Sequence, residues 1–213
     1  MDFLRRKYTL GEELFNAITH GIGALLSVAG CVILLARCHQ LGDGVAVVSS
    51  AIYGATLIIL YTMSTLYHAL ANEKAKAVFR VFDHVTIYLL IAGTYTPYTL
   101  ACLGGAFGWT LFGIVWAAAI VGIVFSSISL RRFQKLSMIC YIAMGWVILI
   151  AIKPLWQVIG TLPMVFLVIG GVLYTGGVLF YQMKESRYMH SIWHLFVIAG
   201  SIFQYFSILL ALT

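Results

Sequence analysis

The sequence predicts an all-α integral membrane protein, a bundle of seven transmembrane helices. The first observation is composition: the chain of 213 residues is 62% hydrophobic and only 9% charged, whereas soluble globular proteins carry about 25% charged residues. The second is that the apolar residues gather into long runs, and a helix needs about 20 predominantly apolar residues to cross the hydrocarbon core of a bilayer. Together they exclude a soluble domain of ordinary composition.

Seven apolar runs follow one another along the chain. Each is expected to be a helix, because hydrocarbon offers backbone N–H and C=O groups no partner outside their own segment. The predicted spans are Leu14–Ala36, Val45–Leu66, Val85–Leu103, Ala106–Ser129, Leu136–Ile152, Leu162–Met183 and Ile192–Leu212. Only short connectors remain between them, so residues 1–213 are expected to form a single domain. No cleavable signal peptide is expected either, because the basic start of the chain runs into Glu12 and Glu13 before the first apolar run.

The basic residues predict the orientation of the bundle, since cytoplasmic loops carry an excess of lysine and arginine. In a seven-span chain the N-terminus shares one side of the membrane with the connectors after the second, fourth and sixth spans. That side holds Arg5, Arg6, Lys7, Lys74, Lys76, Arg80, Arg131, Arg132, Lys135, Lys184 and Arg187. The opposite side holds only Arg37 and Lys153. The N-terminus is therefore expected in the cytoplasm and the C-terminus outside. Basic loops beside anionic lipid account for the net charge of +6, and no nucleic-acid partner is expected.

Polar residues from four distant parts of the chain are expected to meet in one layer of the membrane, near its cytoplasmic face. The first, third and seventh spans begin on this side, and the second span ends there. An ionisable residue within a span is a functional candidate, because a charge at the bilayer centre costs at least ~2.5 kcal/mol. The layer contains Glu13, Asn16, His20, Ser64, His68, Asp83, His190 and His194.

Three histidines of this layer form the candidate metal site. His190 and His194 are four residues apart, so they project from one face of a helix, one turn above the other. With His68 they offer three neutral nitrogen ligands, the set that catalytic zinc sites use while leaving a position for water. Taken singly, the pair also fits an interfacial helix start, and His68 a helix-packing residue. The convergence of the three on one layer favours a metal site.

Asp83 and Ser64 are the candidate catalytic groups beside these histidines. The His-x-x-x-His pattern lacks the internal glutamate of zinc proteases, so Asp83 is the carboxylate that would orient or deprotonate a water molecule. Ser64 lies one turn before His68, where it would hydrogen-bond Asp83 or a substrate carbonyl. The alternative for Asp83 is an ion pair with Arg80 or Lys76. His84 is expected to face away from the site, because adjacent residues on a helix diverge by about 100°.

Glu13, Asn16 and His20 form a second set, one stripe along the first span. The favoured interpretation is a structural polar seam that hydrogen-bonds neighbouring helices, because buried polar groups need partners. Direct participation in catalysis is the alternative.

These motifs together resemble the progestin and adiponectin receptor superfamily (PAQR), and more closely its bacterial haemolysin III-like branch. The resemblance covers almost the whole chain and rests on three motifs in order: Glu-x-x-Asn-x-x-x-His at 13–20, Ser-x-x-x-His at 64–68 with Asp83 downstream, and His-x-x-x-His at 190–194. It implies Zn²⁺ held by His68, His190 and His194, with Asp83 contacting the metal through water. It also implies a ceramidase-like lipid-amide hydrolase activity, a cytolytic activity in the bacterial branch, and a place in the bacterial cytoplasmic (inner) membrane.

Three functions are therefore compared. The leading hypothesis is a zinc-dependent hydrolase that takes a lipid amide or ester as substrate from the cytoplasmic side. The second is a lipid-sensing receptor or membrane-homeostasis factor in which the zinc is structural and a membrane lipid is the ligand. A haemolysin-like cytolytic protein ranks third. A retinal-binding proton pump is excluded, because the seventh span contains no lysine for the Schiff base.

Overall fold

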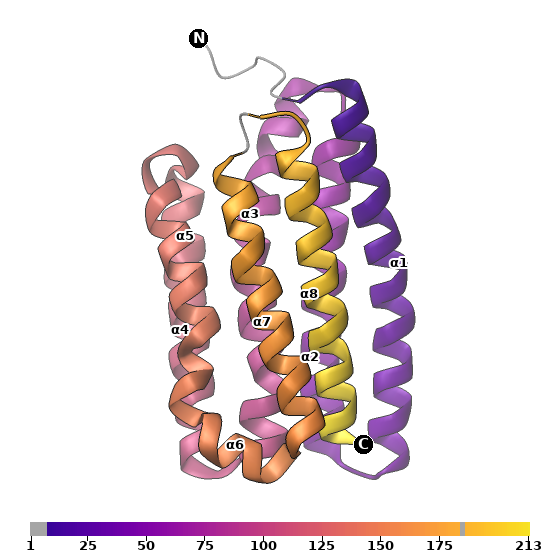
Figure 1. Ribbon diagram of the computed structural model, residues 1–213, viewed down its shortest axis with the longest axis vertical. Coiled ribbons are helices and arrows are strands. Elements are labelled where there is room, and N and C mark those ends of the chain that lie inside the picture. Colours follow the sequence, from indigo (N-terminus) through magenta and orange to yellow (C-terminus); the bar gives the residue numbers. More distant parts are fainter. Residues whose placement is uncertain (1–7, 184–185) are drawn as a thin grey trace.

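The computed structural model describes residues 8–183 and 186–213, and the described chain is helical throughout, without strands. Seven of its helical segments are long and apolar enough to cross a membrane, which confirms the predicted fold class. They run nearly parallel to the long axis of the molecule (Figure 1). The elements are α1 (Leu10–Gln40), α2 (Gly44–Ala69), α3 (Glu73–Thr96), η1 (Pro97–Leu103), α4 (Gly105–Ile128), α5 (Leu130–Trp146), η2 (Val147–Ala151), α6 (Ile152–Ile159), α7 (Thr161–Gln182) and α8 (Met189–Leu212).

Polar residues in the connectors explain where several helices begin. The Thr9 hydroxyl accepts a hydrogen bond from the Glu12 N–H, and the Glu12 carboxylate accepts one from the Thr9 N–H, a capping box that starts α1. Asp43 accepts hydrogen bonds from two backbone N–H groups at the start of α2, and Asn72 accepts one at the start of α3. These caps lie outside the predicted spans, which is why the helices extend beyond the apolar runs.

Two spans are interrupted by irregular helical segments. The third changes at Pro97 from α-helix to π-helix, because proline has no N–H to donate to the preceding turn. The fifth consists of α5, the 3₁₀ segment η2 and the short helix α6. At η2 the Tyr95 hydroxyl accepts a hydrogen bond from the Ile148 N–H (2.7 Å) and donates one to the Gly145 carbonyl (2.9 Å). A side chain thereby satisfies backbone groups that the break in the helix would leave unpaired, as hydrocarbon requires.

The bundle exposes apolar side chains and buries polar ones. Leu25 and Ile150 are 73% and 70% exposed, as expected for residues that face lipid. Between the helices, Tyr61 donates a hydrogen bond to Ser201 (2.7 Å) and Tyr98 donates one to Ser207 (2.7 Å). Because hydrocarbon does not drive apolar helices together, such hydrogen bonds and close packing hold a membrane bundle.

The glycines of α7 allow α8 to approach closely. A Cβ atom on Gly177 would lie 2.9 Å from the Cβ of Phe196, and one on Gly170 would lie 2.8 Å from the side chain of Gln204. The close packing holds α8 in place beside α7, and α8 carries two of the three histidines of the candidate site.

The starts of α1, α3 and α8 and the end of α2 lie at one end of the bundle, and the C-terminus lies at the other (Figure 1). The four polar helix ends are thus brought to one layer, as predicted. The direction of the bundle in the membrane stays a prediction from the charge count. Arg5, Arg6, Lys7 and Lys184, four of its eleven cytoplasmic charges, lie outside the described residues.

Cysteine-accessibility labelling checks this orientation. In a background without the four native cysteines, we expect Lys74→Cys and Arg132→Cys to react only when a membrane-impermeant thiol reagent reaches the cytoplasmic face, and Thr213→Cys to react in intact cells. All three positions are exposed. The reverse labelling pattern would invert the topology and place the polar layer in the outer leaflet.

Candidate metal centre

Two helices supply the three histidines of the candidate metal centre. His68 lies in the last turn of α2, and His190 and His194 lie in the first two turns of α8. All three are buried, with exposures of 3%, 3% and 0%. One ring nitrogen from each lies within 4.8 Å of the others, so this group could hold a metal ion.

Three imidazole nitrogens are a donor set that zinc uses, and one pair of them has the spacing of a tetrahedral site. Two nitrogen atoms bound at about 2.0–2.1 Å to a tetrahedral ion lie about 3.3 Å apart, and the Nε2 atoms of His190 and His194 are 3.1 Å apart. The Nε2 atom of His68 and the Nδ1 atom of His194 have no hydrogen-bond partner among the described residues. Buried nitrogen atoms without a partner are rare in proteins and call for a ligand, an ion or water.

Glu13 contacts one histidine of the candidate metal centre. Its Oε2 atom lies 2.6 Å from Nδ1 of His68, and its Oε1 atom lies 2.8 Å from Nζ of Lys76, in the first turn of α3. The Lys76 ammonium also lies over the ring of Tyr67, 5.1 Å from its centroid. A carboxylate on Nδ1 fixes the tautomer that carries the proton there, which leaves the Nε2 lone pair of His68 for a metal.

The other two residues of the α1 stripe are also buried in this layer. His20 stacks on His194 with ring centroids 3.7 Å apart. Asn16 is fully buried, and neither its amide oxygen nor its amide nitrogen has a hydrogen-bond partner among the described residues. The stripe therefore faces the candidate metal centre as well as the neighbouring helices.

Tyr8, Asp83 and Ser64 complete the surroundings. Tyr8 stacks on His190, with ring centroids 4.8 Å apart. Burial raises the pKa of the Tyr8 phenol well above its usual range, and the charge of the neighbouring Asp83 adds to that increase. Asp83 is 4% exposed and Ser64 is 1% exposed; the hydroxyl of Ser64 has no hydrogen-bond partner in the described part of the chain. Both side chains are thus separated from water.

His84 is not one of the three histidines whose ring nitrogens lie together. Its Nδ1 atom is 2.9 Å from the Arg80 carbonyl oxygen, and its Nε2 atom is 3.3 Å from the Tyr181 hydroxyl. Its distance to the nearest Asp83 oxygen is 3.6 Å, too long for a hydrogen bond. Lys76, named above as an alternative partner of Asp83, forms its described ion pair with Glu13.

Two contacts in this layer were not predicted from the sequence. One is the Glu13–Lys76 ion pair; the charge count places both residues at the cytoplasmic face but cannot pair them. The other joins α1 to the start of α8: Glu12 Oε1 accepts a hydrogen bond from the Tyr188 N–H at 2.7 Å. In the sequence, the indication of these contacts is the pair of adjacent acids, Glu12 and Glu13, at the start of an apolar run.

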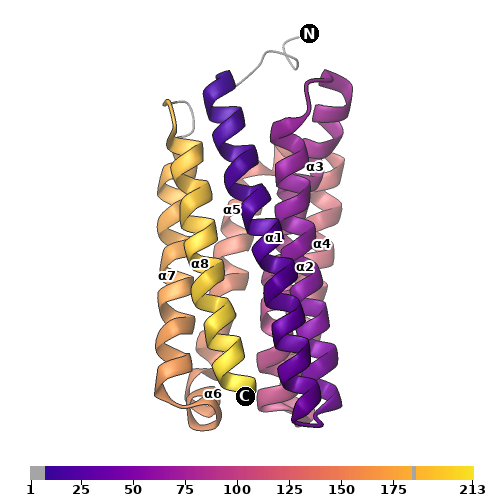
Figure 2. The ribbon, with the colours of Figure 1, turned by 90° about the vertical axis from the view of Figure 1, so that its right-hand side faces the viewer.

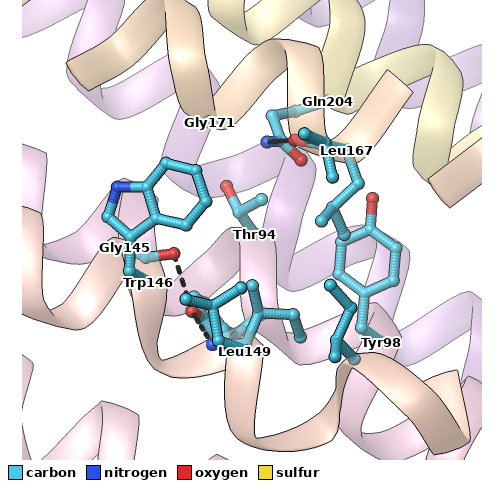
Figure 3. Close-up of a pocket in the computed structure, with 12 residues that line it drawn as sticks. Thr94, Tyr98, Gly145, Trp146, Leu149, Leu167, Gly171 and Gln204 are labelled. Carbon is cyan, nitrogen blue, oxygen red and sulfur yellow. Dashed lines mark hydrogen bonds between the residues drawn. The ribbon is translucent and has the colours of Figure 1, made fainter. Parts of the chain in front are cut away.

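A small cavity in the structure lies elsewhere. It has a volume of about 40 Å³ and is lined mainly by apolar residues of the third, fifth and sixth spans together with Gln204 (Figure 3). Gln204 donates a hydrogen bond to the Leu167 carbonyl. It lies ten residues beyond His194 on α8, about 15 Å along the helix axis. The cavity is therefore separate from the candidate metal centre.

Comparison with known proteins gives consistent matches over most of the chain. Residues 8–205 match the family model described as "Haemolysin-III related". The chain is 46% identical over 198 residues to "Hemolysin-3" of Bacillus cereus, covering 93% of this chain and 90% of the relative. It is 43% identical over 202 residues to "Hemolysin-3 homolog" of Bacillus subtilis (strain 168), covering 95% of each chain. A more distant match is the human "Monocyte to macrophage differentiation factor", 25% identical over 211 residues, which covers 96% of this chain and 86% of the relative.

Proposed function

The chain belongs to the haemolysin III-related family of multi-pass membrane proteins, and from that premise we propose that it is a zinc-dependent hydrolase of a membrane lipid amide or ester. The observation that carries the proposal is the buried group His68, His190 and His194, and the carboxylate that we assign to it is the buried Asp83.

The proposed site has the parts that hydrolysis of an acyl bond requires. A zinc ion held by the three imidazoles would supply a Lewis acid and lower the pKa of a water molecule toward ~7. Asp83 is the general base of the proposal and accepts the proton of the attacking water. Ser64, with an unpaired hydroxyl one turn from His68, donates a hydrogen bond to the substrate carbonyl. The single domain of residues 1–213 carries all of these groups.

The position of the site favours a lipid substrate. All of its groups lie within or beside membrane-spanning helices, so a substrate must present its scissile bond near the level of the lipid headgroups. In the predicted orientation this is the cytoplasmic leaflet, and the membrane of the proposal is the bacterial cytoplasmic (inner) membrane. An amide or ester between a headgroup and an acyl chain lies at that depth.

A panel assay tests the proposal. Purified protein in lipid nanodiscs is analysed for metal content, stripped with a chelator, reloaded with Zn²⁺, and incubated with ceramides, other lipid amides and lipid esters; His194→Ala is the matched control. We expect stoichiometric zinc in the wild type and hydrolysis of one lipid class that depends on zinc. Zinc-loaded protein that is inactive on every class would contradict the hydrolase and favour a lipid sensor with a structural zinc.

Membrane lysis is a second candidate, because two of the matched relatives are named hemolysins. The same preparation distinguishes it: release of a trapped dye from liposomes, with or without zinc, would support lysis. Intact liposomes together with lipid turnover would support the hydrolase.

A further inference from the structure

The first turn of α1 contributes no ligand to the candidate metal centre, yet it contacts both helices that do. α1 packs against α2 and against α8, and it lies between them in the view of Figure 2. Glu12 and Glu13 are buried, each 5% exposed. Burying two adjacent carboxylates at the edge of a membrane costs free energy unless each charge is paired, so each is expected to have a partner.

Glu13 is directed toward α2. It reaches Nδ1 of His68 at 2.6 Å, a short hydrogen bond of the kind that involves a charged partner. Its second oxygen is held by Lys76 at 2.8 Å. The Lys76 side chain is 20% exposed, and its ammonium neutralises the carboxylate that contacts His68. The chain Lys76–Glu13–His68 fixes the rotation of one ligand ring.

Glu12 is directed toward α8. It accepts the Tyr188 N–H at 2.7 Å through one oxygen and the Thr9 N–H at 2.8 Å through the other. Tyr188 has a φ of 60°, and its side chain makes no capping hydrogen bond to α8 among the described residues. Glu12 therefore caps α8 through Tyr188, which lies 176 residues later in the chain, and its charge suits the positive end of that helix. His190 is two residues beyond the capped N–H.

From these contacts we propose that Glu12 and Glu13 are the positioning residues of the metal centre. Glu13 sets the tautomer and orientation of His68, and Glu12 sets the start of α8 and with it the height of His190 and His194. Acting from one turn of one helix, the two acids hold the ligands of two other helices at the distance that one ion requires. The inference rests on the metal site of the proposed function but not on hydrolysis.

Metal affinity tests this role. Apo protein in detergent is titrated with Zn²⁺ and with Co²⁺, whose visible absorption reports the geometry of its ligands. For Glu13→Gln we expect a 10–100-fold weaker affinity, the usual cost of removing a carboxylate behind a ligating histidine, and an altered Co²⁺ spectrum. Glu12→Ala is expected to weaken binding as well. Glu73→Gln, which removes an exposed carboxylate at the start of α3, is the matched control and should bind as the wild type does.

A second pair of variants separates positioning from folding. Lys76 is 20% exposed in its side chain, so Lys76→Met is expected to fold and to bind zinc more weakly, whereas Lys76→Arg should restore the affinity. Wild-type affinity and an unchanged Co²⁺ spectrum in Glu13→Gln would overturn the positioning role and leave the metal site standing. A wild-type protein that binds no metal would overturn the site itself.

Discussion

Replacing any one of His68, His190 and His194 by alanine is expected to abolish stoichiometric zinc binding. The physical reason is geometric: two imidazoles satisfy only half of a tetrahedral ion, and a structural or catalytic zinc site in a protein uses at least three protein ligands. The largest effect is expected for His194. It is fully buried, its Nε2 atom lies 3.1 Å from the Nε2 atom of His190, and its ring stacks on His20.

The measurement is the metal content of each purified variant after dialysis against free Zn²⁺. His39→Ala is the matched control, because His39 is exposed at the far end of α1, and it should retain the metal. A variant of the three that keeps one zinc ion per chain removes that histidine from the site.

Asp83→Asn is expected to keep the zinc and lose hydrolysis. Asparagine has nearly the same shape as aspartate, but it is neutral and a poor base. A positioned general base contributes about 10²–10⁴-fold to a rate, and the loss in kcat should be of that order. Metal affinity should fall by at most about 10–100-fold, as for a group that touches a ligand or a water rather than the ion.

Two measurements on one preparation separate the outcomes of this substitution. Bound zinc is quantified first, and lipid turnover is then assayed at saturating zinc, with Glu73→Gln as the control. Complete loss of zinc would make Asp83 a direct fourth ligand and favour a closed structural site. Unchanged turnover with zinc in place would assign the base to another group, with Glu13 and His20 the next candidates.

The sequence predicts the fold well because the membrane constrains it so strongly. Each of the seven apolar runs is helical in the structure. The helices begin earlier than the predicted spans, because capping residues such as Thr9, Asp43 and Asn72 are polar and lie outside the apolar runs. The subdivision of the fifth span into α5, η2 and α6 was not predicted. It depends on the Tyr95 hydroxyl, which comes from another helix, so no pattern within the fifth span reveals it.

For the candidate site, the sequence predicts the spacing of residues within one helix but not the contacts between helices. The four-residue spacing of His190 and His194 lies within one helix, where the sequence fixes the geometry. The partner of Glu13 depends instead on the register between α1 and α2, which packing decides: a Cβ atom on Gly23 would lie 2.8 Å from the ring of Tyr61, so only glycine lets the two helices meet there. The register between two helices cannot be derived from a single sequence, and neither can the contact of Glu12 with Tyr188.

The contact between Glu12 and Tyr188 also bears on the order of events during biosynthesis. A chain emerges from the ribosome N-terminus first, so α1, α2 and α3 enter the membrane long before α8 is translated. In that interval Glu12 lacks the Tyr188 N–H, and His68 lacks the other two histidines. When α8 inserts, it supplies the Tyr188 N–H to Glu12 and brings His190 and His194 to His68. A metal ion could therefore find all three histidines only after α8 has inserted, whereas Glu13 already has its partners in α2 and α3 before that step.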